Sequence, residues 1–171
     1  MKPLTLQIDN KFVDGYIYLG RLFLINREGD VCSVLMDDLI KPFSNSEYYN
    51  LLKLAFLRND WLLNEQSKTT INLNGIKSKF DAFWKKASNN EFTIRIDNNT
   101  KRHFQIPDAP VFDIKAHGMH LYMGNRNGLY ESLIIPDKDE FKSIHRPRKV
   151  FDARTNFISA KAGEVMISSN A

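Results

Sequence analysis

The chain has 171 residues, of which 43% are apolar and 12% aromatic, so it can bury one core and is not an intrinsically disordered protein. No apolar run approaches the roughly 20 residues of a transmembrane helix. The net charge of +4 permits an anionic partner such as nucleic acid but does not require one.

The amino terminus and the cysteine content indicate a cytoplasmic protein that does not associate with membranes. Met1-Lys2-Pro3 leads directly into a segment of alternating apolar and polar residues, and this start lacks the features of a secretory signal. Cys32 is the single cysteine and lies in the mainly apolar stretch 31–36. We therefore expect a buried, reduced and unreactive thiol.

The first 43 residues have the apolar pattern of β-strands. Residues 4–8 predict one strand, and residues 16–19 and 21–25 predict two further strand segments separated by Gly20. A glycine-containing turn at 26–30 leads to a return strand at 31–36. We therefore predict a hairpin in this part of the chain.

The period changes to that of helices between residues 44 and 90. Ser44 and Glu47 have the spacing of a capping box, which predicts a helix over about 46–64. A polar connection follows, with a short strand expected at 70–73. A second helix is expected after Asn74, with an apolar stripe formed by Ile76, Phe80, Phe83 and Trp84.

Strand patterns return after residue 90. The stretch 111–133 predicts a strand, a bend at Gly118 and two strands joined by a tight turn, because Asn127-Gly128 favours the positive φ angles of such a turn. Other strands are expected at residues 92–96, 103–106, 140–144, 150–153, 157–160 and 165–168.

Three segments of the chain resemble one another. Each has a phenylalanine and an aspartate, then a strand, a glycine turn and a second strand, and the three begin at Phe12, Phe112 and Phe151. The last two begin 39 residues apart. A period of about 40 residues with about four short strands resembles the blades of a β-propeller. The Trp-Asp, Gly-His and kelch double-glycine repeats are absent, so no named propeller family is indicated.

The resemblance implies a mainly β fold with a two-helix insertion, in which antiparallel sheets are similar to propeller blades. Residues 1–43 are the first blade-like segment, residues 44–90 the helical insertion, and residues 91–171 further blade-like segments. The alternative is a compact α+β domain with both helices packed over one antiparallel sheet.

Outside the insertion the chain is long enough for about three blades, whereas closed propellers have roughly four to eight. We therefore expect an incomplete propeller with an open sheet edge. A protein partner, self-association or the helices would then cover that edge, because an exposed edge invites aggregation.

Few residues have the spacing of a catalytic or metal site. His117 and His120 can share a metal ion only if Gly118 bends sharply, and ordinary turn histidines are the alternative. Local nucleophile motifs and glycine-rich phosphate loops are absent. We therefore expect no catalytic residue, no metal or other cofactor, and no enzyme activity. A small hydrolase assembled from separated His and Asp residues is a third alternative.

Two basic clusters, residues 101–103 and 145–149, are candidates for contacts with a partner or with nucleic acid. The alternative, which we favour, is that they are solvated loops whose cations protect exposed sheet edges. The cations concerned are Lys101, Arg102, Arg146, Arg148 and Lys149.

One tryptophan falls in each predicted helix, Trp61 in the first and Trp84 in the second. We expect both to anchor the helices on the sheet. The alternative is that their rings contact a partner, because tryptophan is enriched in binding hot spots.

These observations predict a non-catalytic interaction or scaffold module that is part of a larger assembly. The alternative function is a nucleic-acid-associated protein that binds through the two basic clusters. Affinity for RNA or DNA that strengthens at low salt distinguishes the alternative from the first prediction.

Overall fold

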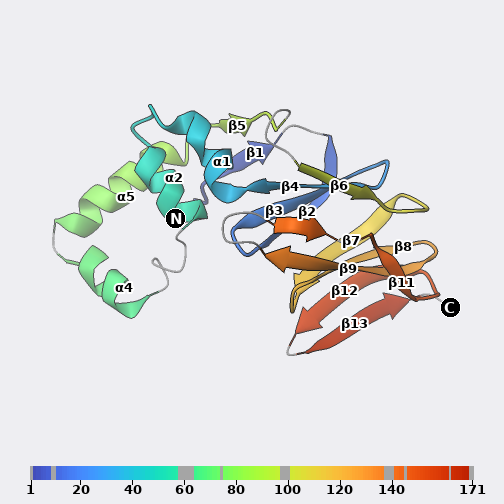
Figure 1. The fold of residues 1–171 in the computed structure, drawn as a ribbon. Helices are drawn as coiled ribbons and strands as arrows, with labels where there is room; N and C mark the ends of the chain where they lie inside the picture. Colours follow the sequence, from blue (N-terminus) through green and yellow to red (C-terminus); the bar gives the residue numbers. More distant parts are fainter. Residues whose placement is uncertain are drawn as a thin grey trace. The chain divides into compact units, whose positions relative to one another are not determined.

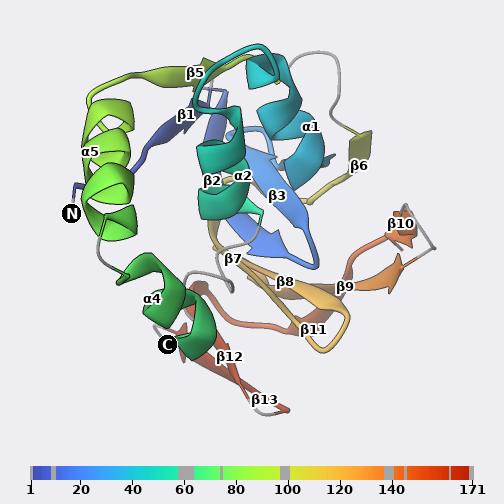
Figure 2. The same cartoon turned by 90° about the vertical axis from the view of Figure 1, so that its left-hand side faces the viewer.

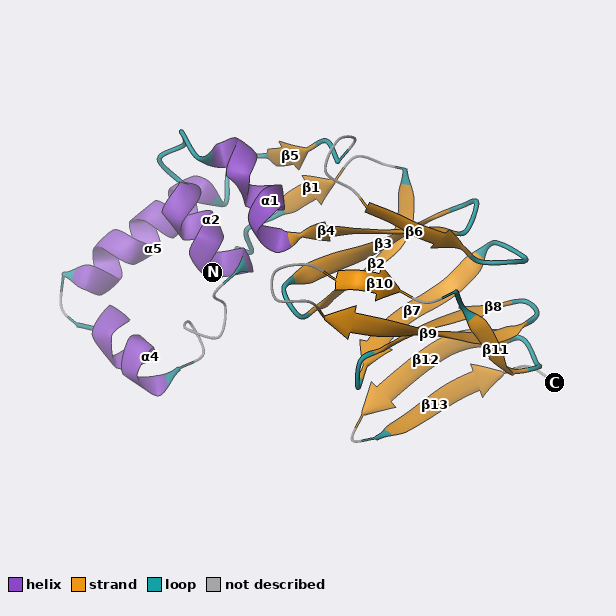
Figure 3. Cartoon of the chain, viewed as in Figure 1, coloured by secondary structure: helices purple, strands orange, loops and turns teal. Residues whose placement is uncertain are grey.

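The computed structural model describes residues 2–8, 11–57, 64–73, 75–96, 101–136, 141–144, 146–161 and 163–169. Within these ranges, the side chains of Lys101, Pro136 and residues 141–144 are not described. The described chain is mainly β, with short helices and mostly antiparallel sheets, as the sequence predicts (Figures 1 and 3).

The described helices all lie between residues 36 and 87. They are α1 (Met36–Ile40), the 3₁₀ helix η1 (Lys41–Phe43), α2 (Tyr49–Phe56), α4 (Glu65–Ile71) and α5 (Ile76–Ala87). The described strands are β1 (Leu6–Ile8), β2 (Phe12–Tyr18), β3 (Arg21–Asn26), β4 (Asp30–Leu35), β5 (Phe92–Ile94), β6 (Lys101–Gln105), β7 (Val111–His117), β8 (His120–Asn125), β9 (Gly128–Pro136), β10 (Phe141–Ile144), β11 (Arg148–Phe151), β12 (Thr155–Lys161) and β13 (Glu164–Ser169).

The chain divides into two compact units. The helical unit combines Met1–Asp9 with Leu35–Asn99, and the β unit combines Asn10–Val34 with Thr100–Ala171. The predicted insertion, residues 44–90, falls within the helical unit. The predicted limits of the insertion, between residues 43 and 44 and between residues 90 and 91, remain predictions from the sequence.

Aromatic packing and one parallel strand pair define the helical unit. The rings of Tyr48 and Phe83 stack with centroids 5.3 Å apart, which fixes α5 beside the start of α2. Phe92 of β5 makes edge contacts with Tyr48 and with Phe43, at 5.8 and 5.5 Å. β5 pairs in parallel with β1, where Leu6 lies opposite Phe92. The first strand of the chain therefore belongs with the helices.

The second predicted helix, expected after Asn74, is confirmed as α5, whereas the first predicted helix differs from the structure. In the described residues there are four short α-helices, and the one over the predicted span 46–64 is α2, with Leu57 as its C-cap. The predicted capping box is wrong, because Ser44 is the C-cap of η1 and α2 has no side-chain cap. Glu47 instead forms a 2.8 Å ion pair with Lys86, and hydrogen bonding to this ammonium lowers the pKa of the Glu47 carboxyl.

The strand predicted at 70–73 is also wrong, because residues 65–71 form α4. Asn64 caps this helix, and its side-chain oxygen accepts hydrogen bonds from the N–H groups of Gln66 and Ser67, at 2.9 and 3.4 Å. Glu65 lies in the first turn, where a carboxylate interacts favourably with the helix dipole. These start signals outweigh the strand propensity of the β-branched residues that follow.

The β unit contains three separate antiparallel sheets, counting described strands. One has the order β2-β3-β4-β6, the second has the order β10-β9-β8-β7 with β11 also paired to β9, and the third is β12-β13 (Figure 1). The described strands form no closed propeller.

The stretch 111–133 forms a strand, a tight turn and a second hairpin, as predicted, but the positive φ angle expected at Asn127 is not found. The described non-glycine residues with positive φ are Leu19, Asp108 and Met119. Gly118 and Met119 form the first turn with φ angles of 55° and 67°. At the second turn, the Asn125 side-chain oxygen accepts hydrogen bonds from the N–H groups of Asn127 and Gly128, at 2.8 and 3.0 Å. A Cβ at position 128 would lie 2.2 Å from the Phe151 carbonyl oxygen, so this position requires glycine.

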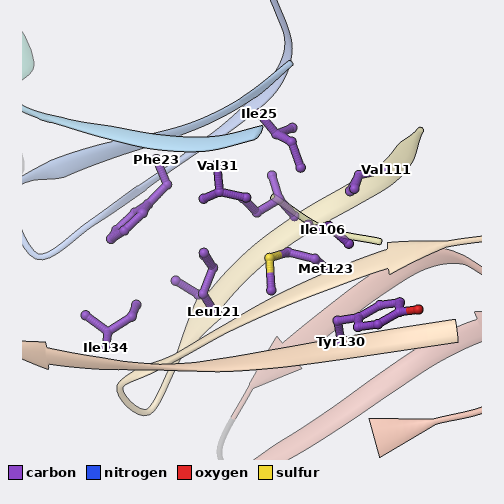
Figure 4. Close-up of a cluster of buried hydrophobic side chains, with 11 residues drawn as sticks. Phe23, Ile25, Val31, Ile106, Val111, Leu121, Met123, Tyr130 and Ile134 are labelled. Atoms are coloured by element: carbon purple, nitrogen blue, oxygen red, sulfur yellow. The ribbon is translucent and has the colours of Figure 1, made fainter. Parts of the chain in front are cut away.

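The core of the β unit is formed by alternate residues of several strands (Figure 4). Burying each such side chain contributes roughly 1.5–3 kcal/mol. The buried cluster comprises Phe23, Ile25, Val31, Ile106, Val111, Ile114, Ala116, Leu121, Met123, Tyr130 and Ile134.

The β12–β13 hairpin is attached to β7 and β8 by three local contacts. The buried Asp113 side-chain oxygen accepts a hydrogen bond of 2.7 Å from the Ile158 N–H. A Cβ at Gly124 would lie 2.7 Å from the Thr155 carbonyl oxygen, so only glycine permits this approach. At the hairpin turn, the Gly163 N–H donates to His117 Nε2 at 3.3 Å. These contacts determine which edge of the hairpin faces β7.

Replacing Asp113 with alanine should lower the free energy of unfolding by about 2–3 kcal/mol, because it leaves the Ile158 N–H without its charged acceptor. Asp152→Ala is the matched control, since Asp152 occupies the corresponding place in the sequence repeat but is 86% exposed and pairs only with Lys149. The control should change stability by less than about 0.5 kcal/mol. Urea unfolding followed by circular dichroism measures both, and equal effects would contradict this account of Asp113.

Candidate interaction surface

The β12–β13 hairpin presents one apolar and one mixed face. Ile158 lies opposite Ile167 on the inner face, and Ile158 is fully buried. On the outer face, Phe157 and Met166 are 55% and 58% exposed and lie diagonally across the two strands. Met166 thus projects beside the open edge of β13, and Phe157 lies one strand further in on the same face.

The outer edge of β13 is not paired with any described strand. In an antiparallel pair, hydrogen-bonded and non-hydrogen-bonded residue pairs alternate. The Ile158 N–H donates to Asp113, so Ile158 and Ile167 form a non-hydrogen-bonded pair. The N–H and C=O of Ile167 therefore point away from β12, and by alternation those of Val165 do as well.

Three other edges of the β unit carry features that discourage strand addition. β6 contains Lys101 and Arg102, β11 contains Arg148 and Lys149, and β2 has a bulge near Asp14. Charged residues and bulges are common ways in which proteins protect an edge. β13 has the sequence Glu-Val-Met-Ile-Ser-Ser, without lysine, proline or an internal bulge. Of these four edges, that of β13 is therefore the best suited to accept another strand.

Three of the predicted cations are paired with carboxylates, and they lie on the strands β6 and β11 and not in loops as predicted. Arg102 forms an ion pair with Asp30. Arg148 donates two hydrogen bonds to one oxygen of Glu131, at 2.9 and 2.8 Å. The third pair joins Lys149 to Asp152 at 2.8 Å. Pairing reduces the positive field available to phosphate groups.

Arg146 lies in a hollow of about 310 Å³ that also includes Leu133 and Arg148. Glu131, half-buried in the same hollow, is 3.5 Å from His120 Nε2. Burial and the nearby Glu131 carboxylate raise the pKa of the Tyr122 hydroxyl. The residues that line this hollow therefore include positive and negative side chains, and the net charge of the lining is small.

The two candidate metal-binding histidines lie directly opposite each other across the tight turn, as the bend at Gly118 permits. They have different partners, however. His120 Nδ1 donates to the Gly118 carbonyl at 2.9 Å, whereas His117 Nε2 accepts from Gly163. In the described part of the chain, no three His, Cys, Asp or Glu side chains are grouped to hold a metal ion.

A serine–histidine contact was not predicted from the sequence. Ser33 Oγ lies 2.7 Å from His103 Nε2 and accepts a 3.1 Å hydrogen bond from Arg21. The register shift between β4 and β6 leaves His103 as an extra residue of the bulge. Such a pair resembles a nucleophile and its base, but Ser33 is fully buried and its oxygen already accepts from a cation. We therefore interpret the contact as structural.

Trp84 Nε1 donates a 2.9 Å hydrogen bond to the Lys2 carbonyl, so its indole is anchored within the helical unit. Two hollows of about 300 and 350 Å³ flank this side chain. Trp61 lies outside the described residues.

Comparison with protein-family models, with curated proteins and with solved structures found no match. None of the helices in the described ranges has the length and apolar character needed to cross a membrane.

Cys32 should react slowly in the folded protein. Burial, and then the neighbouring Asp30 carboxylate, raise the pKa of the thiol, so less thiolate is present at any pH below that value. Alkylation by iodoacetamide at pH 8 should therefore be slower in the native protein than in urea, as followed by mass spectrometry. A native rate equal to that of the unfolded chain would contradict this assignment.

Proposed function

We propose that this protein is a non-catalytic interaction module that binds an extended segment of another polypeptide by adding it as a strand to β13. The observation that carries the proposal is the contrast between the edges: β13 has outward N–H and C=O groups and no cation, and its one charged residue, Glu164, is at its first position, whereas β6 and β11 carry cations. Strand addition satisfies these backbone groups and is a common mode of peptide recognition.

The outer face of the hairpin supplies apolar area for the same interaction. Phe157 and Met166 are each more than half exposed, and alternate side chains of an added strand would lie beside them on that face. Burying such a side chain contributes roughly 1.5–3 kcal/mol. Backbone hydrogen bonds would provide the alignment, and these two residues would provide selectivity for apolar side chains.

The resemblance to propeller blades supports the same proposal. The β2-β3-β4-β6 sheet has four strands and the sheet of β7, β8, β9, β10 and β11 has five, whereas β12-β13 has two strands. In this interpretation the hairpin is the inner half of an incomplete blade. A partner, or a second copy of the chain, would then supply the missing strands within a larger assembly.

Nucleic-acid binding through residues 101–103 and 145–149 has weaker support. Arg102, Arg148 and Lys149 each pair with a carboxylate. Their placement on two sheet edges fits the protective role that charged residues play there. Affinity for single-stranded RNA that rises steeply as salt falls would favour this second function instead.

Ile167→Pro tests the proposed edge, because it removes an outward N–H that β12 does not use. The matched control is Ile167→Ala, which removes most of the side chain but keeps the N–H. Peptides selected from a displayed random library against the unmodified protein serve as probes. Ile167→Pro should weaken their binding at least about tenfold, or 1.4 kcal/mol, and Ile167→Ala much less. Equal losses in both variants, or unchanged binding to Ile167→Pro, would contradict the proposal. Circular dichroism confirms that both variants fold.

A further inference from the structure

Figure 2 shows α4 and α5 of the helical unit, which follow each other along the chain. A groove lies between these two helices. Its floor is apolar and is formed by Ile71 of α4 with Phe80 and Trp84 of α5. The rings of Phe80 and Trp84 lie 5.7 Å apart, as expected for side chains one helical turn apart. The groove has a volume of about 300 Å³.

A second hollow of about 350 Å³ lies on the other side of Trp84. Asp81 and Trp84 line both hollows, so the two are parts of one surface divided by the indole. Leu73 and Ile76, between α4 and the first turn of α5, are 54% and 45% exposed and extend the apolar area. We call the surface formed by the residues that line either hollow the Trp84 groove. These residues are Lys2, Lys68, Ile71, Asn72, Lys77, Phe80, Asp81, Trp84, Lys85, Ser88 and Asn89.

The rim of the Trp84 groove is basic. The two hollows are lined by four lysines and one carboxylate, and this lining has a formal charge of +3 if every group is ionised. Lys68 is paired with Glu65, which lies outside the lining. The residues concerned are Lys2, Lys68, Lys77, Lys85 and Asp81.

The walls of the Trp84 groove are held in place by contacts that a ligand need not break. The Tyr48–Phe83 stack fixes α5 against the start of α2, and the Trp84 hydrogen bond to the Lys2 carbonyl fixes the indole. Asn64 caps the start of α4. A pre-organised groove loses less conformational entropy on binding.

We propose that the Trp84 groove binds an acidic, amphipathic segment of a partner protein, with a bulky apolar side chain in each hollow and acidic side chains against the lysine rim. An apolar floor with a basic rim is complementary to such a segment. Asp81 is placed to accept a hydrogen bond from a peptide N–H but repels phosphate. This argues for a peptide over nucleic acid, although lysines near an aromatic ring also suit single strands. The site is separate from β13.

The probe is a synthetic peptide of about 14 residues containing glutamate, leucine and phenylalanine in an amphipathic helical pattern. Calorimetry on the unmodified chain measures its affinity, and the fluorescence of Trp84 in a Trp61→Phe chain reports where it binds. We expect saturable binding with a blue shift of the Trp84 emission. A peptide with serine in place of leucine and phenylalanine, and one with lysine in place of glutamate, should each bind at least about tenfold more weakly.

Lys68→Glu combined with Lys77→Glu should weaken binding of the acidic peptide at least about tenfold. The matched control is Lys79→Glu combined with Lys161→Glu, which makes the same change in net charge at lysines that do not line the groove. Equal weakening by both pairs would overturn the proposal, because binding would then depend on net charge alone. Tighter binding of a single-stranded oligonucleotide than of the peptide, with the same sensitivity to the groove variants, would overturn it in favour of nucleic acid.

Discussion

The hydrogen bond from the Ile158 N–H to the buried Asp113 carboxylate determines which edge of the β12–β13 hairpin is left unpaired. A carboxylate that is 7% exposed requires partners, and here it also has Lys115 Nζ at 3.1 Å. Because this bond occupies the inner edge of β12, the pairing pattern directs the backbone groups of Ile167 to the opposite edge of the hairpin. Gly124 makes the arrangement possible, since any side chain there would collide with Thr155. The free edge of β13 is thus a consequence of how β12 is anchored.

The distribution of charge over the β unit agrees with that interpretation. Arg102 and Arg148 lie on edge strands and each is held by a carboxylate of the neighbouring strand, so they protect an edge without creating a strong positive field. In the helical unit the lysines surround an apolar groove instead. The roles proposed for these cations, edge protection in the β unit and peptide binding in the helical unit, do not depend on nucleic acid.

Local patterns predicted much of this fold, and contacts between distant residues could not be predicted. Alternating apolar residues and Asn127-Gly128 were sufficient for the hairpins of 111–133, because strand pairing across a tight turn depends on adjacent sequence. The sequence predicted a strand where the end of α4 lies, because Thr69, Thr70 and Ile71 have strand propensity. The residue that decides for a helix is its N-cap, Asn64, which lies five residues before Thr69. The parallel pairing of β1 with β5 and the contact between Ser33 and His103 join residues far apart in sequence, which no local signal reports. Among the candidate contact residues, Arg102 and Arg148 could be placed on edge strands only after the order of the strands in each sheet was known.

Amide hydrogen exchange of the free chain, measured residue by residue by NMR, tests the open edge most directly. Met166 faces Ser159 in a hydrogen-bonded pair, so its N–H should exchange slowly, whereas the N–H groups of Val165 and Ile167 should exchange much faster. Addition of a bound peptide should then slow the exchange at Val165 and Ile167 and leave Met166 unchanged. Slow exchange at all three positions in the free chain would show that the edge of β13 is already covered, and would contradict the account.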